Sequence, residues 1–441
     1  MINKSIKHIL PVTIAAISAI EILDSRGLPT VEVTIKSTSL NTASASVPSG
    51  ASTGVNEVVE LRDDDLRRYH GKGVLNAVNN VNTIIWDKVV AKSFVQKDFD
   101  NYLIELDGTE NKSNLGGNAI LACSLAFAKL AAMDNYLSLY QYINILSGKP
   151  EMKMPVPMIN IINGGKHADN GLDIQEFMIM PIMEGTINDA IRAGSEIFHS
   201  LKKIIQKNGY STNVGDEGGF APNINSTTDA IEMIKEAIRI AGYEIEKDIM
   251  LALDVAASEF FTENVYNMEG AGQKKSSQDM IQMYQDLIEK YPIFSIEDPM
   301  SEHDLEGFIN ITKKLRRKIQ IVGDDLFTTN PKLITKYAEQ KMCNAVLIKL
   351  NQIGTLSETL EAIKIAKKLG YNSIISHRSG ETEDTFIADV AVGTGVGQIK
   401  TGSLCRSDRL SKYNRLLKIS SIEHNRIPFA GASIMNVLKK K

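Results

Sequence analysis

Hydrophobic and polar positions near the start of the chain follow the pattern of a small α+β domain. Runs rich in β-branched and small residues are separated by turn formers and lie at 14–22, 30–36 and 42–48. These runs predict an antiparallel β-meander. Apolar residues then recur at helical spacing near 74–93 and 118–146. We therefore predict an α+β domain over residues 1–147, ending before the helix breakers Gly148 and Pro150.

The pattern changes from residue 148 onward, where short continuous apolar runs alternate with amphipathic helices. The segment 345–350 (AVLIKL) shows one such strand, followed by Thr355 and Glu358 at capping-box spacing and by Gly370 as a helix stop. The predicted helix buries a stripe made of Leu360, Ile363 and Ala366. This pattern is typical of parallel strands that are buried on both faces of a sheet. We therefore predict that residues 148–441 form an eight-stranded α/β barrel of the TIM type.

The composition and charge are those of an ordinary globular protein. Of the 441 residues, 43% are hydrophobic and 23% are charged, which excludes disordered, collagen-like and coiled-coil classes. The formal net charge of -4 gives no general attraction for nucleic acid. Cys123, Cys343 and Cys405 lie far apart without a CxxC pair, so we predict neither a disulfide framework nor a zinc site. This cysteine usage fits a reducing cytoplasm.

An apolar run at 9–22 follows Lys4, Lys7 and His8 and has two interpretations. A secretory signal peptide has a similar basic start. The run contains Pro11, however, is shorter than a membrane span, and passes without a small-residue cleavage site into charged residues. We therefore favour a short extension before a β-strand and predict no membrane span.

Ionisable residues stand at the carboxyl ends of six predicted strands. The runs LALD, FSIE, QIVGD, VLIK, SIISH and GQIK end at Asp254, Glu297, Asp324, Lys349, His377 and Lys400. One such residue alone is better explained as a solvated charge where a strand meets a loop. The strands of an α/β barrel end at one mouth, however, and catalytic groups lie there. We therefore predict that these six side chains meet in an active site.

Three of the six side chains are carboxylates, which raise one another's pKa at a common mouth unless a cation joins them. Oxygen ligands without histidine or cysteine favour Mg²⁺, with Mn²⁺ as a substitute, over zinc. Asp254, Glu297 and Asp324 are therefore the predicted metal ligands. The alternative is a carboxylate cluster paired with lysine or arginine.

Lys349 lies between the acidic strands and His377, which makes it a candidate base. A lysine at its ordinary pKa of about 10.4 is a poor base at neutral pH. Lowering that pKa to roughly 7.4 takes about 4 kcal/mol, which divalent cations and a second lysine such as Lys400 could supply. The alternative for Lys349 is a buried salt bridge.

Four loops carry further candidates. SGASTG at 49–54 has hydroxyls and a permissive backbone that suit folding over a ligand or coordinating a metal. His167 lies in the glycine-rich segment NGGKHADN, and Glu217 stands among glycines in GDEGG. Arg378 and Ser379 combine a charged fork with a hydroxyl, which suits phosphate.

Together these segments resemble the enolase family, and most of all its bacterial type. The motifs run in family order from DSRG at 24–27 to KTGSLCRSDR at 400–409 and include SGASTG, LDGTENKS, NGGKHADN, QEFMI, GDEGGFAPN, DVAASEF, SIEDP, GDDLFTTN, IKLNQIGTL and SHRSGETED. The resemblance implies a carbon–oxygen lyase of glycolysis that reversibly dehydrates 2-phosphoglycerate to phosphoenolpyruvate with two Mg²⁺ ions per active site. It also implies a barrel with one early antiparallel strand.

The resemblance implies a role for each site residue. The implied metal ligands are Asp254, Glu297, Asp324 and Ser52. The implied catalytic residues are Lys349 as the base for the C2 proton and Glu217 as the acid for the departing 3-hydroxyl, assisted by Glu176. The implied substrate-binding residues are His167, Glu176, Lys349, His377, Arg378, Ser379 and Lys400.

Two other functional readings remain beside this one. Racemases and sugar-acid dehydratases of the same superfamily share the carboxylates and the barrel, but they lack the SGASTG loop and the Arg378–Ser379 pair. Some enolases bind plasminogen at the cell surface through C-terminal lysines, and this chain ends in Lys439, Lys440 and Lys441. A solvated basic tail is the favoured interpretation of those lysines, and a cell-surface or secreted fraction is the alternative.

The resemblance also gives expectations about assembly and about departures. Family members form homodimers or octamers, so we expect a homo-oligomer in the cytoplasm. The chain departs from the common pattern at Leu28, Gly117, His303 and Leu305. None of these is a catalytic position, so the departures affect only loop packing and subunit contacts.

Overall fold

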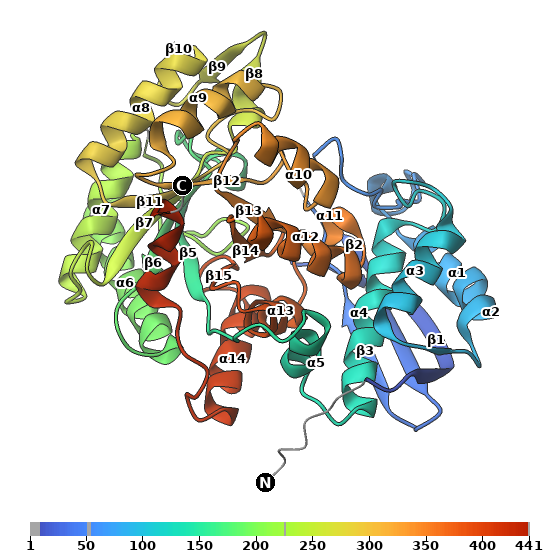
Figure 1. Ribbon diagram of the computed structural model, residues 1–441. Helices are drawn as coiled ribbons and strands as arrows, with labels where there is room; N and C mark the ends of the chain where they lie inside the picture. The colour runs from blue at the N-terminus through green and yellow to red at the C-terminus, as the bar shows by residue number, and fades with distance from the viewer. Residues whose placement is uncertain (1–8, 51–53, 225, 440–441) are drawn as a thin grey trace.

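The computed structural model describes residues 9–50, 54–224 and 226–439. A smaller N-terminal part lies beside a larger barrel (Figure 1). Its sheet has the order β3-β2-β1-β4, with antiparallel pairs throughout. The strands are β1 (Val12–Leu23), β2 (Pro29–Ser37), β3 (Thr42–Ser46) and β4 (Ser93–Phe94). The predicted meander is therefore confirmed, and the strand reading of the early apolar run agrees with β1.

The N-terminal part also contains helices, several of which contact this sheet. They are α1 (Leu75–Asn80), a π-helical turn (Val81–Ile85), α2 (Trp86–Val89), α3 (Gln96–Asp107), α4 (Gly117–Asp134) and α5 (Leu139–Leu146). The pattern over 118–146 contains two helices, because Tyr136 has a positive φ and Ser138 starts α5 as its N-cap. Helix α3 was not predicted. The predicted boundary between residues 147 and 148 falls between α5 and the first barrel strand and stays a prediction.

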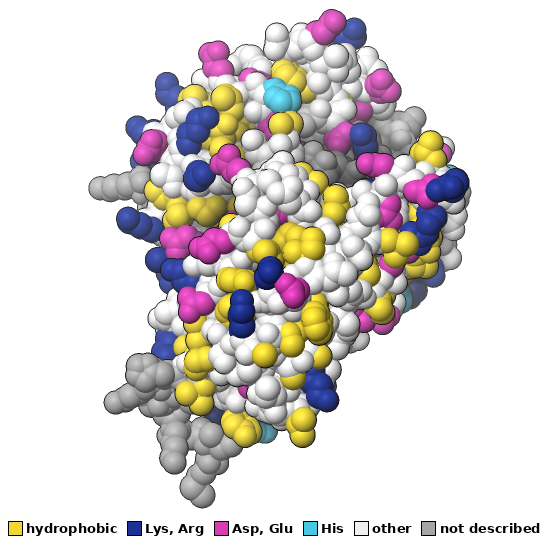
Figure 2. Space-filling view, turned by 90° about the vertical axis from the view of Figure 1, so that its right-hand side faces the viewer, with side chains coloured by type: hydrophobic (Ala, Val, Ile, Leu, Met, Phe, Trp, Pro, Cys, Tyr) yellow, Lys and Arg dark blue, Asp and Glu magenta, His cyan; other side chains and the backbone are white. Residues whose placement is uncertain are grey.

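Helix α4 is long and apolar enough to cross a membrane by length and composition alone. In this fold 83% of its apolar window is buried, and it packs against β2 and β3 (Figure 1). That burial is typical of a core helix. The face turned to the viewer in Figure 2 carries acidic and basic side chains interspersed with hydrophobic ones.

The barrel is closed, with the order β11-β12-β13-β14-β15-β5-β6-β7. Its strands are β5 (Val156–Asn163), β6 (Glu176–Pro181), β7 (Ile249–Asp254), β11 (Ile293–Glu297), β12 (Gln320–Gly323), β13 (Ala345–Ile348), β14 (Asn372–Ser376) and β15 (Gln398–Lys400). Strand β6 runs antiparallel to both neighbours, and the other pairs are parallel. The early antiparallel strand is therefore confirmed.

Amphipathic helices alternate with the strands. They are α6 (Ile187–Lys207), α7 (Thr227–Ile240), α8 (Ser277–Lys290), α9 (Leu305–Leu315), α10 (Pro331–Glu339), α11 (Leu350–Ile353), α12 (Leu356–Lys368), α13 (Phe386–Thr394) and α14 (Ser407–Ile422). A small unpredicted sheet, β8 (Phe261–Thr262), β9 (Val265–Met268) and β10 (Gln273–Lys275), is inserted after β7. Thr355 caps α12 as expected, because its Oγ1 accepts the N–H of Glu358 at 3.2 Å.

The C-terminal 3₁₀ segment Gly431–Lys439 closes the barrel at the end where the parallel strands begin. Ile434 and Val437 pack into the apolar interior of the barrel. The Nδ2 of Asn372, the first residue of β14, donates to the Ile434 carbonyl at 3.0 Å. This end is therefore filled, and the opposite rim remains for chemistry.

The N-terminal part caps a helix of the barrel. At the start of α12, the N–H of Leu356 donates to Ser124 Oγ at 3.0 Å, and the N–H of Ser357 donates to Asp100 Oδ2 at 2.9 Å. Both acceptors belong to helices of the N-terminal part, α4 and α3. Unpaired N–H groups in a first helical turn are costly when buried. The two parts are therefore joined by a shared cap as well as by apolar packing.

The Asp100→Asn variant is expected to become more stable relative to wild type as the pH rises. Burial, opposed in part by Ser357, Ser124 and Gln96, raises the pKa of Asp100 from 3.8 to about 6. The folded carboxyl therefore holds its proton more tightly than the unfolded one does. Wild type consequently loses stability between those two pH values, by about 3 kcal/mol in total.

Asparagine does not titrate, so the variant escapes this loss. The free energy of unfolding of Asp100→Asn minus that of wild type should increase through the window and level off above about pH 6. Urea unfolding at a series of pH values measures this difference. A difference that stays flat across the window contradicts the raised pKa.

Candidate active site

The six predicted strand-end residues gather at one rim of the barrel. Asp254, Glu297 and Lys400 end β7, β11 and β15, and the other three directly follow β12, β13 and β14. The register places Glu297 opposite Asp254 and Lys400 opposite Ser376. All six side chains are buried or nearly so. The convergence expected of parallel strand ends is therefore present.

Glu176 reaches the same rim from the opposite chain direction. It is the first residue of β6, and because β6 is antiparallel, its start lies opposite the end of β7, so that Glu176 pairs with Asp254. The sequence placed Glu176 at the site only through the family resemblance, since an apolar run does not reveal strand direction.

The Lys400 ammonium lies among three carboxylates. Its Nζ is 2.7 Å from Asp254 Oδ2, 2.9 Å from both Glu297 oxygens and 3.2 Å from Glu176 Oε1. Burial alone would lower the pKa of Lys400, but these carboxylates outweigh it and raise the pKa well above its usual range. The sequence left open a carboxylate cluster paired with lysine as the alternative to a metal site. In the protein alone, that alternative describes the arrangement around Lys400.

Two groups of side chains in the described part of the site could hold a metal ion, but neither includes the predicted ligands Asp254 and Glu297. Burial raises the pKa of Glu297, and Asp254 and Asp324 raise it further, so the predicted ligands act on one another across the rim. Two groups of described residues have ligand atoms within 4.8 Å of one another, namely His167, Glu176 and Glu217, and Asp298, Asp324 and Asp325. Of the predicted metal ligands, Asp324 belongs to the second of these groups. Ser52 lies outside the described residues.

Lys349 pairs directly with Asp324. Its Nζ donates to Asp324 Oδ2, and Gln352 Nε2 donates to the other oxygen of that carboxylate at 2.9 Å. Burial alone would lower the pKa of Lys349, but Asp324 and then Glu297 outweigh it, and the net shift is upward. The lowered pKa expected of Lys349 was assigned to bound divalent cations and a second lysine, so it stays a prediction. In the protein alone, Lys349 forms the salt bridge that the sequence left as its alternative.

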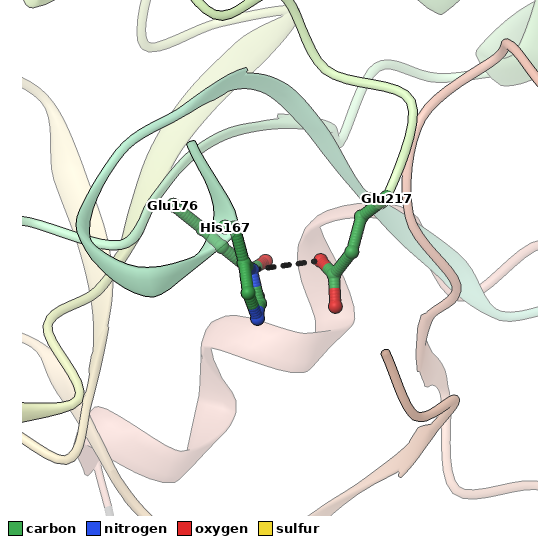
Figure 3. Close-up of side chains that lie close together, drawn as sticks. All are labelled: His167, Glu176 and Glu217. Carbon is green, nitrogen blue, oxygen red and sulfur yellow. Dashed lines mark ion pairs between the residues drawn. The ribbon is translucent and has the colours of Figure 1, made fainter. Parts of the chain in front are cut away.

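A second buried cluster in the site consists of His167, Glu176 and Glu217 (Figure 3). His167 Nδ1 is 3.7 Å from Glu176 Oε1 and 3.6 Å from Glu217 Oε2. Asn160 Nδ2 donates to Glu217 Oε2 at 3.1 Å, and His377 Nε2 lies 3.4 Å from its Oε1. The Glu217 carboxylate therefore accepts a hydrogen bond from Asn160 and lies close to two imidazole rings.

The two glutamates of this cluster differ in protonation. Burial, reinforced by Glu217, raises the pKa of Glu176 well above its usual range. Burial alone would raise the pKa of Glu217 as well, but His167 and His377 outweigh it and lower the pKa well below its usual range. In the protein alone, Glu176 is therefore the glutamate that keeps its proton, and Glu217 is the ionised one.

Arg378 and Ser379 follow β14 into the same site. Arg378 Nη1 donates to Glu57 Oε2 at 2.8 Å and to Asn351 Oδ1 at 3.2 Å. Ser379 Oγ lies 3.4 Å from His167 Nε2. The predicted anion-binding pair is thus held at the rim beside His167.

Several residues of the site were not singled out from the sequence. They are Glu57, Asn160, Asp298, Asp325 and Arg409, each in contact with a predicted residue. Asp298 and Asp325 stand beside Glu297 and Asp324 in the motifs SIEDP and GDDLF, which was a usable signal. Asn160 and Glu57 carry no comparable signal.

Fold and site together define a class of protein. A barrel with buried carboxylates and lysines at the carboxyl rim, capped by an α+β part, is typical of an enzyme whose catalytic groups lie at the strand ends. Residues 151–438 match the family described as "Enolase, C-terminal TIM barrel domain", and residues 14–143 match "Enolase, N-terminal domain". The chain therefore belongs to the enolase family. It is a lyase with the dehydration chemistry of that superfamily.

Proposed function

We propose that this protein catalyses the glycolytic reaction of its family, the reversible dehydration of 2-phosphoglycerate to phosphoenolpyruvate. The observation that carries the proposal is that buried lysines and buried glutamates lie together at one rim and are linked through Glu176. Lys349 pairs with Asp324, Lys400 lies among Asp254, Glu297 and Glu176, and Glu176 and Glu217 stand with His167. Such an arrangement serves a base and an acid that act on one substrate.

In the proposed mechanism Lys349 takes the C2 proton. It must first give up its bond to Asp324, since that bond raises its pKa. Two Mg²⁺ ions, for which Mn²⁺ can substitute, supply when bound the positive charge that stabilises the developing charge on the substrate carboxylate. Asp254, Glu297, Asp324 and Ser52 are the residues that would hold these ions.

The glutamate pair supplies the proton for the departing 3-hydroxyl. Glu217 is the proposed donor to the hydroxyl, and Glu176 is the member that holds the proton before substrate binds. Their closest carboxylate oxygens lie within 4.8 Å of each other, so one rearrangement of the proton between them precedes the loss of water.

The phosphate is proposed to bind Arg378 and Ser379, with His167, His377 and Lys400 as further substrate contacts. Arg378 is held by Glu57 at 2.8 Å and presents a preorganised fork in a buried place. This phosphate contact distinguishes the proposal from a racemase or a sugar-acid dehydratase, whose substrates carry no phosphate.

The test is to mix purified protein with 2-phosphoglycerate and follow the enol absorbance. We expect turnover with Mg²⁺ and its loss with a chelator, restored when Mg²⁺ is added in excess. Glycerate without the phosphate is the matched control and should not react. Turnover that survives chelation, or equal turnover of the phosphate-free substrate, argues against the proposal.

Assembly and location rest on the family resemblance alone. A homodimer or octamer in the cytoplasm stays our proposal. For plasminogen, Lys439 is exposed, and Lys440 and Lys441 lie outside the described residues. Plasminogen binding at the cell surface therefore stays a prediction from the sequence.

A further inference from the structure

Arg409 is a fully buried arginine that joins two loops of the active site. It lies near the start of α14, with no solvent exposure. Its Nη1 donates to the Arg378 carbonyl and its Nη2 to the Ser379 carbonyl, each at 2.6 Å. Its Nη2 also donates to the Asp216 carbonyl at 3.3 Å, and its Nε pairs with Asp408 at 2.7 Å. The guanidinium therefore ties the loop after β14 to the loop that carries Glu217.

One further contact of Arg409 has a chemical consequence. Its Nη1 also meets Nδ1 of His377. A guanidinium has donors only and does not lose its proton in proteins, so Nδ1 of His377 must be the acceptor. A neutral imidazole that accepts at Nδ1 carries its proton on Nε2. That Nε2 lies 3.4 Å from Glu217 Oε1, an acceptor.

We propose that Arg409 is a positioning residue that fixes His377 as a neutral imidazole with its proton on Nε2, so that His377 donates to Glu217. The role deepens the proposed function, since it concerns the glutamate assigned to the departing hydroxyl. In the opposite tautomer a lone pair on Nε2 would face the Glu217 carboxylate and repel it. Arg409 thus excludes the form that would push Glu217 away.

The charges around His377 agree with a neutral ring. The charged groups acting on it are Glu217, Arg409, Lys400 and Lys349. Burial lowers the pKa of His377 most, Glu217 opposes that effect, and the three cations lower the pKa further, so the net shift is well below the usual value. Arg409 is the nearest of these cations, since it contacts the ring itself.

The test is ¹⁵N NMR of histidine-labelled protein without substrate, with the His377 signal assigned from a His377→Gln sample. In wild type, Nδ1 should stay unprotonated from about pH 8.5 to about pH 5.5, a range in which an ordinary histidine becomes protonated. Arg409→Lys should keep this state, because an ammonium also can only donate. Arg409→Gln should lose it, because an amide can accept a proton from Nδ1, and His377 should then gain an Nδ1 proton within that range.

Arg415→Gln is the matched control, since Arg415 lies on the same helix and pairs with Asp389 instead. It should leave the His377 signal unchanged. For turnover we expect Arg409→Gln to lower kcat by about 10- to 100-fold with KM changed by less than about 3-fold, while Arg409→Lys retains most of kcat.

Several results overturn the proposal. They are a protonated Nδ1 in wild type, a His377 signal in Arg409→Gln that matches wild type, or equal losses of kcat in the lysine and glutamine variants. If Arg409→Gln does not fold, wild type and Arg409→Lys still decide, because both must keep Nδ1 unprotonated at the acid end. The NMR readout needs no substrate, so failure of the protein to turn over 2-phosphoglycerate would refute the proposed function and leave the tautomer result standing.

Discussion

Replacing Lys349 by alanine is expected to lower kcat for 2-phosphoglycerate dehydration by about 1,000-fold or more. General bases contribute about 10²- to 10⁴-fold to rates, and alanine leaves no proton acceptor at this point of the rim. The neighbouring Asp324 cannot replace it, because that carboxylate is held by Gln352 and is a proposed metal ligand. The loss should fall on kcat more than on KM, since the contact is made chiefly in the transition state.

Exchange of the C2 hydrogen of 2-phosphoglycerate in deuterated water separates this step from the loss of water. Lys349→Ala should abolish the exchange, and Glu217→Gln should retain it while losing turnover. Lys364→Ala is the matched control, because Lys364 is an exposed lysine of α12 paired with Glu361, and it should behave as wild type. Full turnover or full exchange in Lys349→Ala shows that another group is the base.

The rim residues could be predicted because their positions follow from the barrel itself. Parallel strands end at one mouth, so a charged residue at the end of each apolar run is a local signal with a global meaning. Asp254, Glu297 and Lys400 were found in this way, and Lys400 Nζ lies 2.7 Å from Asp254 Oδ2 and 2.9 Å from both Glu297 oxygens.

What the sequence did not reveal depends on contacts between distant parts of the chain. The bond between Lys349 and Asp324 raises the pKa of Lys349 in the protein alone, and a strand-end pattern does not say which rim charges pair. The cap that Asp100 gives to α12 joins residues far apart in sequence, with no local motif on either side. Helix α3 was missed because the predicted elements before and after it left its segment as a connection.

Replacing Lys400 by methionine is expected to destabilise the protein strongly when no divalent cation is supplied. Asp254, Glu297 and Glu176 are almost fully buried and share the Lys400 ammonium, so methionine removes the positive charge that these side chains contact. Removing one partner of a buried ion pair costs about 3–5 kcal/mol. Urea unfolding in the presence of a chelator should show a loss of this size, whereas wild type should remain folded under the same conditions.

Adding Mg²⁺ separates a metal site from a plain buried salt-bridge cluster. If these carboxylates bind the cation, Mg²⁺ should return much of the lost stability to Lys400→Met, because a ligand that binds only the folded state stabilises it by mass action. Lys112→Met is the matched control, since Lys112 is a buried lysine paired with the carboxylate of Glu358 outside the rim. That variant should be destabilised without any response to Mg²⁺. Equal Mg²⁺ responses in the two variants, or none in Lys400→Met, would mean that the carboxylates at the rim are held together by Lys400 alone, and the proposed metal ligands would have to be abandoned.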